Sequence, residues 1–173
     1  MIGAYIKMTL GAAILIFLIA TLTLWLLAQY SHIRPPLGLK EGRLLPCPNS
    51  PNCISSQANP HDKVHYLPPI EFTGSTEQAK NALLEVLHSQ THSSVVENDG
   101  NYIRSEFRSQ IFGFVDDVEF LIDPETKVIH FRSASRVGHS DLGANRMRME
   151  KLRSMFLQKL NLPAPDTSSG SSP

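Results

Sequence analysis

The sequence predicts an α+β domain: an antiparallel meander sheet of about four strands with two helices packed on one face, preceded by one transmembrane helix. Three observations support this prediction. A long uncharged stretch opens the chain, four alternating segments joined by short turns fill its second half, and an amphipathic helix stands on either side of those segments. At 173 residues the chain has room for one such domain with extensions.

The amino-terminal stretch Met8–Ala28 contains 21 residues and no charged side chain. It is long enough for a bilayer core, which needs about 20 apolar residues as a helix, and too long for the roughly 7–15 apolar residues of a signal peptide. Trp25 and Tyr30 lie near its end, where aromatic rings favour the membrane interface. We therefore expect residues 1–30 to be a retained transmembrane anchor, with a buried core helix or a cleaved leader as the alternatives.

Two segments have the composition of loops. Residues 31–46 contain three prolines and two glycines, which predicts a linker without regular structure. The end of the chain, "PAPDTSSGSSP", predicts a disordered tail over residues 163–173. The folded domain is then expected to span residues 47–162.

A pair of cysteines follows the linker in "CPNSPNC". Outside the cytoplasm, Cys47 and Cys53 would form a disulfide across this tight turn. In the cytoplasm a metal role gains weight, and Cys47, Cys53, His61 and His65 could be four zinc ligands, although the cysteine spacing exceeds the usual two to four residues. Free structural cysteines are a third possibility. The basic residues beside the apolar stretch favour a cytoplasmic domain, whereas the cysteine pair favours the opposite side.

The segment "STEQAKNALLEVLHS" predicts the first helix of the domain. Ser75 and Gln78 have the spacing of a capping box, in which each side chain bonds the backbone N–H of the other residue. The apolar residues fall on one helical face, which we assign to the core.

The four predicted strands form two hairpins. "SSVVEN" leads through Asp99–Gly100 into "NYIRSEFRS", and "FVDDVEFLID" leads through "PETK" into "VIHFRSASR". Side chains alternate between the faces of a sheet, so one face should be apolar and the other should carry an acidic strand between two basic strands. Opposite charges across strands stabilise a sheet, which is a structural explanation. An open charged platform that binds a polar partner is the functional alternative.

The stretch "RSASRVGHSDLGANRMRMEKLR", residues 132–153, leaves the last strand and enters the final helix. Ser140 or Asp141 can cap this helix, and its apolar stripe should contain Met149. Arg146 lies three residues before Met149, so we expect it on the core-facing side. There it needs a carboxylate partner, for which Asp116, Asp117 and Glu106 are the candidates.

A helix start rich in arginines is suited to an anion. The alternative is a salt-bridge network that pins the turn between strand and helix. We assign no catalytic residue, cofactor or metal ligand, because the sequence has no nucleophile elbow and the neighbours His139, Ser140 and Asp141 do not by themselves make a triad. The predicted ligand-binding residues are Arg104, Arg108, Asp116, Asp117, Arg132, Arg136, Ser140, Asp141, Asn145 and Arg146.

Three motifs, "CPNSPNCISSQ", "YIRSEFRSQIFGFVDDVEFLIDPE" and "RSASRVGHSDLGANRMRMEKLR", resemble the family catalogued as domain of unknown function 1499 (DUF1499). The resemblance runs from about Cys47 to Phe156. Members are typically bacterial envelope proteins, or plastid proteins, with an amino-terminal membrane or export segment. The resemblance therefore implies an exported domain and favours a Cys47–Cys53 disulfide, but it implies no established activity and transfers no catalytic residue.

These observations predict a single-pass protein of the inner (cytoplasmic) membrane, with Met8–Ala28 in the bilayer and the folded domain in the periplasm or otherwise outside the cytoplasm. Its expected function is non-catalytic binding of an anionic small molecule, a lipid headgroup or an envelope protein partner. Balanced charge, 16 basic against 16 acidic residues, argues against nucleic acid. The alternative is a hydrolase that uses the Arg/Asp/Ser cluster. A deep pocket with Arg136, Arg146 and an unpaired acid would favour that enzyme, whereas fully paired charges without a cavity would favour binding or a structural role.

Overall fold

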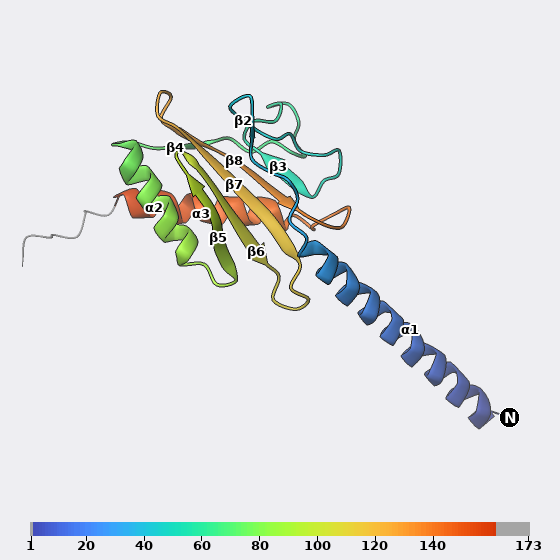
Figure 1. Ribbon diagram of the computed structural model, residues 1–173. Helices are drawn as coiled ribbons and strands as arrows, with labels where there is room; N and C mark the ends of the chain where they lie inside the picture. Colours follow the sequence, from blue (N-terminus) through green and yellow to red (C-terminus); the bar gives the residue numbers. More distant parts are fainter. Residues whose placement is uncertain (1, 162–173) are drawn as a thin grey trace, which may run out of the picture.

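The computed structural model describes residues 2–161, so the predicted tail over 163–173 lies outside the described residues. A long helix, α1 (Ile2–Ser31), projects from an α+β domain (Figure 1). Within the described part of the chain, α1 is the single helix long and apolar enough to cross a membrane. Its side chains are mostly exposed, but Ala28 and Ser31 at its end are fully buried against the domain.

The domain is built on one antiparallel sheet. Its four long strands are β5 (Ser93–Asp99), β6 (Tyr102–Arg108), β7 (Val115–Asp123) and β8 (Val128–Ser135), which pair in the predicted meander. The predicted count of about four strands is too low, because β3 (Cys53–Ser55) and β4 (Ile70–Glu71) both pair with the outer edge of β8. At three and two residues, these strands are too short to show an alternating pattern. They cover an edge that would otherwise offer unpaired backbone groups.

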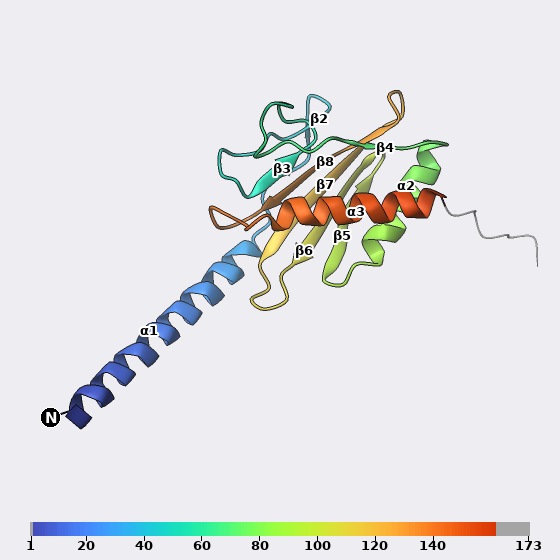
Figure 2. The ribbon, with the colours of Figure 1, turned by 180° about the vertical axis from the view of Figure 1, so that it is seen from behind.

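Two helices, α2 (Thr76–His88) and α3 (Ala144–Asn161), cover one face of this sheet, as Figure 2 shows. The predicted capping box of α2 is present: Ser75 Oγ accepts from the N–H of Gln78 at 3.1 Å, and Gln78 Oε1 accepts from the N–H of Ser75 at 3.0 Å. The core between helices and sheet is apolar and includes the fully buried side chains Phe120, Phe131, Phe156, Leu83, Leu87, Ile103, Ile122, Ile129, Met149 and Leu152.

The segment predicted as an unstructured linker, residues 31–46, contains a small hairpin of β1 (Leu39–Lys40) and β2 (Arg43–Leu44). The expectation of no regular structure is therefore wrong for these residues. Glu41 and Gly42 form the turn with φ of 53° and 72°, the conformation that a tight two-residue hairpin requires. The chain before this hairpin runs across the sheet face opposite to α2 and α3 (Figure 1). It buries the face that the sequence predicts to be charged.

Candidate functional site

The charged face of the sheet consists of alternate residues of β6, β7 and β8. The strand register places Arg104 opposite Glu119, Glu106 opposite Asp117, and Arg132 on the other side of Glu119. These five side chains are almost completely buried, with relative exposures of 7% or less. The predicted alternation of basic and acidic residues is confirmed, and the face is covered rather than open.

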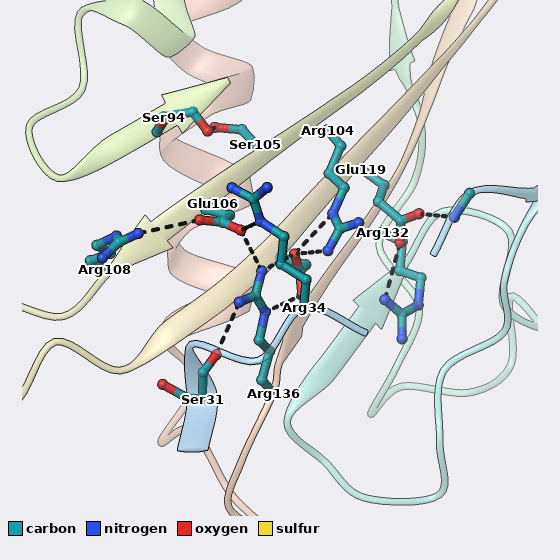
Figure 3. Close-up of polar contacts among 12 residues, drawn as sticks. Ser31, Arg34, Ser94, Arg104, Ser105, Glu106, Arg108, Glu119, Arg132 and Arg136 are labelled. Atoms are coloured by element: carbon teal, nitrogen blue, oxygen red, sulfur yellow. Dashed lines mark hydrogen bonds and ion pairs between the residues drawn. The ribbon is translucent and has the colours of Figure 1, made fainter. Parts of the chain in front are cut away.

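Asp117 is the acceptor that joins the strands of this face. Its carboxylate accepts from Arg104 Nε at 3.0 Å and Nη2 at 2.8 Å, and from Arg136 Nε at 2.7 Å and Nη2 at 2.8 Å. Such paired contacts of a guanidinium fix orientation as well as charge. Arg136 also donates to Glu106 at 2.7 Å and to the carbonyl of Ser31 at 3.0 Å, so one side chain links the sheet to the end of α1 (Figure 3). Its hydrogen bonds to Asp117 raise the pKa of Arg136 despite burial.

Glu106 is contacted by three arginines. Arg34 Nε and Arg136 Nη2 each donate at 2.7 Å, and Arg108 Nη2 lies at 3.4 Å. Burial alone would raise the pKa of Glu106, but the hydrogen bonds from Arg34 and Arg136 outweigh it and lower the pKa to about 2. Glu106 is therefore ionised throughout the physiological range, and the segment after α1 is bound to it through Arg34.

Glu119 and Arg132 form a separate pair on the same face. Glu119 is fully buried and accepts from the Tyr102 hydroxyl at 2.8 Å, the N–H of Gly38 at 3.2 Å and Arg132 Nη1 at 3.1 Å. Burial, followed by the charge of Glu119, raises the pKa of Tyr102. Arg132 Nε is the one buried side-chain nitrogen or oxygen without a hydrogen-bond partner in the part of the chain that the structure describes.

A cleft of about 360 Å³ opens beside Arg132. One wall is the chain from Tyr30 to Leu37, and the other is formed by the ends of β7 and β8 with Asp117, Arg132 and Arg136. Arg34 also lines the cleft, so its walls carry three guanidinium groups and one carboxylate. In Figure 3 one nitrogen of Arg132 reaches Glu119 while the rest of its guanidinium points away from the Glu106 cluster.

A second polar network lies on the helix side of the sheet. Asp116 points there, opposite to its neighbour Asp117, and pairs with Arg148 at 2.5 Å. Arg148 also donates to Asn145 Oδ1 at 2.6 Å. Asn145 is fully buried, accepts from Ser133 Oγ at 2.6 Å, and donates to the carbonyl of Asn52 at 2.9 Å. This network ties the start of α3 to β8 and to the cysteine loop.

The predicted pairing of Arg146 with a carboxylate is wrong. Arg146 Nη2 instead donates to the backbone carbonyls of Lys63, Val64 and Tyr66 at 3.0–3.2 Å. The inward stripe of α3 begins at Asn145, four residues before Met149, so Arg146 lies on one flank of the helix. Arg148 lies on the other flank and forms the ion pair with Asp116 that was predicted for Arg146.

Asp141 caps α3, as predicted. Its carboxylate accepts from the N–H groups of Gly143 at 3.0 Å and Asn145 at 2.7 Å, while Ser140 Oγ accepts from the N–H of Leu142 at 3.3 Å. Unpaired N–H groups at a helix start are what an anion would bind. Here the protein supplies its own carboxylate to them.

The predicted disulfide between Cys47 and Cys53 is confirmed. Because this bond uses both sulfurs, the zinc alternative with His61 and His65 is wrong. His65 is engaged elsewhere, with Nδ1 at 2.7 Å from Asp62 and Nε2 at 3.2 Å from the carbonyl of Ser50.

The structure separates the predicted site residues rather than gathering them in one pocket. Five of them share the charged face: Arg104, Arg108, Asp117, Arg132 and Arg136. Asp116 and Asn145 lie behind the sheet, and Ser140, Asp141 and Arg146 lie around the start of α3. The predicted set omits Arg34, Glu106, Glu119 and Arg148. Strand alternation already placed Glu106 and Glu119 on the charged face, whereas nothing in the linker sequence marked Arg34.

A protein-family model described as "Protein of unknown function (DUF1499)" matches residues 43–156. This match covers most of the folded domain, so the chain belongs to that family. No curated protein matches the chain, and neither does any solved structure.

Proposed function

We propose that this member of the DUF1499 family is a single-pass inner-membrane protein whose folded domain lies in the periplasm and binds a small anion, such as a phosphate or carboxylate group, beside Arg132. One observation carries the anion site. Arg132 is only 7% exposed, its Nε lacks a hydrogen-bond partner among the described residues, and it lines a cleft. A buried donor without a partner costs roughly 1–3 kcal/mol, and an anion entering the cleft would recover this cost when the Arg132 guanidinium turns its Nε toward the cleft.

The charge around the cleft supports an anion. Arg34, Arg104, Arg108, Arg132 and Arg136 contribute five positive charges to this face of the sheet, and the acids in their ion pairs are Glu106, Asp117 and Glu119. The exposed Glu97 lies opposite Arg104 on β5 and offsets one further charge. Five bases against four acids leave an excess of one positive charge. A planar guanidinium is suited to phosphate and carboxylate groups, because its N–H groups match their oxygens.

Two observations support the anchor and the compartment. α1 has the length and composition of a membrane-spanning helix. The Cys47–Cys53 disulfide is typical of an oxidising compartment such as the periplasm.

The hydrolase alternative is less well supported by the site. Asp116 and Asp117 are each held by arginines, and Asp141 is engaged as the cap of α3. Arg136 and Arg146 contact different parts of the domain instead of sharing a pocket with an unpaired acid. Binding without chemical conversion is therefore the function that we propose.

Titration of the purified full-length protein with inorganic phosphate tests the anion site, with calorimetry and the unfolding temperature as readouts. We expect phosphate to bind and to raise the unfolding temperature, by an amount equivalent to about 2.7 kcal/mol at one hundred times Kd. Arg132→Met should abolish this effect. Arg132→Lys keeps the positive charge beside Glu119 but loses Nε, so it should bind more weakly while remaining folded.

The matched control is Arg43→Met, which removes an exposed arginine away from the cleft and should bind like the wild type. Equal phosphate binding by the Arg132→Lys and wild-type proteins would contradict the proposed site. Titration with short-chain phosphatidylglycerol alongside free phosphate distinguishes a lipid headgroup from a soluble anion as the source of the charge.

A further inference from the structure

Two loops of the domain expose large apolar side chains at their tips. Beyond α1, Leu142 and Ile111 are the most exposed large apolar residues in the described part of the chain, at 92% and 85%. Ile111 lies in the β6–β7 loop (109–114), and Leu142 lies in the β8–α3 loop (136–143). Single exposed apolar residues are common on protein surfaces. The informative feature is that Ile111 and Leu142 lie at the same end of the domain.

Both loops lie beside the carboxyl-terminal end of α1, one on each side (Figures 1 and 2). A groove of about 320 Å³ lies between these two loops and α1. Leu24 and Leu27 of α1 form one wall of this groove, and the opposite wall includes Phe114 from one loop and Val137 from the other. The loops therefore lie alongside a turn of α1 that belongs to the uncharged segment.

The contacts at the end of α1 hold this arrangement. Ser31 Oγ accepts from the N–H of Val115 at 3.0 Å, at the foot of the β6–β7 loop. His32 Nε2 lies 3.2 Å from the carbonyl of Gly113 in that loop, and Arg136 binds the carbonyl of Ser31 at the start of the other. Each loop is thus tied to the last turn of the helix.

These positions point to the lipid surface as the partner. Trp25 and Tyr30 are exposed on the last turns of α1, and such aromatic side chains prefer the membrane interface. Residues of both loops line a groove with Leu24 and Leu27, which lie in the same turns of α1. Leu142 has a φ of 54°, a conformation that glycine and asparagine adopt more easily than leucine. A leucine that is 92% exposed in such a conformation is suited to contact with an external apolar surface.

We infer that the β6–β7 and β8–α3 loops form a membrane-contacting surface, in which Ile111 and Leu142 enter the interfacial layer of the bilayer that α1 crosses. Lipid then covers the groove between these loops and α1. The inference rests on the membrane-spanning part of the proposed function and is independent of the anion site.

Site-specific labelling of the full-length protein in vesicles of phosphatidylcholine and phosphatidylglycerol tests this surface. Because both native cysteines are in the disulfide, an introduced cysteine is the one free thiol. Ile111→Cys and Leu142→Cys would each carry an environment-sensitive fluorophore. Glu125→Cys, on the exposed β7–β8 turn at the far end of the sheet, is the water-exposed control, and Phe17→Cys is the control within the bilayer.

We expect blue-shifted emission and loss of fluorescence to lipid-borne quenchers at positions 111 and 142, as at position 17, and neither effect at position 125. If position 17 is quenched while 111 and 142 behave like 125, the loop contact is overturned but the anchor stands. If position 17 is not quenched either, the membrane anchor fails, and the loop contact fails with it. Urea unfolding midpoints equal to the wild type's would verify that the labelled proteins are folded.

Discussion

The two faces of the sheet are both buried, but by different means. On the helix side, apolar residues such as Val118 and Phe120 pack against α2 and α3. On the other side, Asp117 and Glu119 of the same strand pair with arginines and are covered by a chain segment without a helix. The N–H of Gly38 in that segment donates to Glu119. One strand therefore serves two interiors, one stabilised by apolar burial and the other by charge pairing.

Because the two faces are stabilised differently, they should respond differently to substitution. Apolar burial is non-directional, so the loss of one side chain costs the buried area and the cavity that remains. A buried ion pair contributes little net stability compared with an apolar replacement. Removing only one of its two partners leaves the other charge buried and unpaired, which is strongly destabilising. The charged face should therefore tolerate the removal of complete pairs better than the removal of single partners.

Asp117→Ala should have the largest effect. It leaves Arg104 and Arg136 without their shared acceptor and should lower the free energy of unfolding by about 3–5 kcal/mol. Urea unfolding measures this, with Phe131→Ala on the apolar face as the comparison, for which we also expect about 3–5 kcal/mol. Asp117→Leu combined with Arg104→Met removes that ion pair completely and leaves Arg136 its contact with Glu106, so it should cost less than Asp117→Ala. If the combined variant is the less stable one, the two faces do not differ in the way proposed here.

The pH dependence of stability should reveal Glu106. Its pKa in the folded protein is about 2, below its ordinary value of 4.5, so the unfolded chain binds the proton first as pH falls. The stability that Glu106 contributes, about 3 kcal/mol, is then fully present above pH 4.5 and is lost as pH falls toward 2. Urea unfolding across this window should show a shallower decline for Glu106→Gln. The control Glu125→Gln should follow the wild type, and an unchanged slope in Glu106→Gln would contradict the assignment.

Arg34→Met should have the smallest effect, about 1 kcal/mol or less. The side chain of Arg34 is 60% exposed, although its partner Glu106 is only 3% exposed and keeps its contact with Arg136. The same urea measurement would test this, with Arg43→Met as a control for removing an exposed charge. A loss as large as that of Asp117→Ala would mean that the segment after α1 depends mainly on this one contact.

Local patterns in the sequence were enough to predict the long helices and strands of the fold. The Ser75–Gln78 spacing predicts the start of α2, and alternation predicts which side of β6, β7 and β8 each residue occupies. Contacts between segments that are distant in the sequence left no local pattern from which they could be predicted. β3 and β4 exist because β8 offers them an edge, and Arg34 finds Glu106 only after the chain has crossed the sheet.

The sequence therefore predicted only part of the candidate site. The arginines of the charged face were expected together, since strand register follows from alternation and turn length. The error at Arg146 arose from the helix face: the inward stripe begins one residue earlier, at Asn145, and one residue corresponds to about 100° of rotation in an α-helix. Arg146 and Arg148 therefore lie on opposite flanks, and the ion pair is made by Arg148. The unpartnered nitrogen of Arg132 depends on the path of residues 30–37, which composition alone did not define.

The docking of Ser31 also determines how far the domain can reach. A flexible linker of sixteen residues, such as 31–46 was expected to be, would let a domain sweep a region about 20–24 Å in radius around its anchor. With Ser31 held by Val115 and Arg136, that freedom is lost, and the domain keeps one orientation relative to α1. On the proposal that α1 spans a membrane, such a protein cannot search the space above the bilayer. It would reach other membrane components by lateral diffusion, and a soluble ligand would have to come to the bilayer surface to be bound.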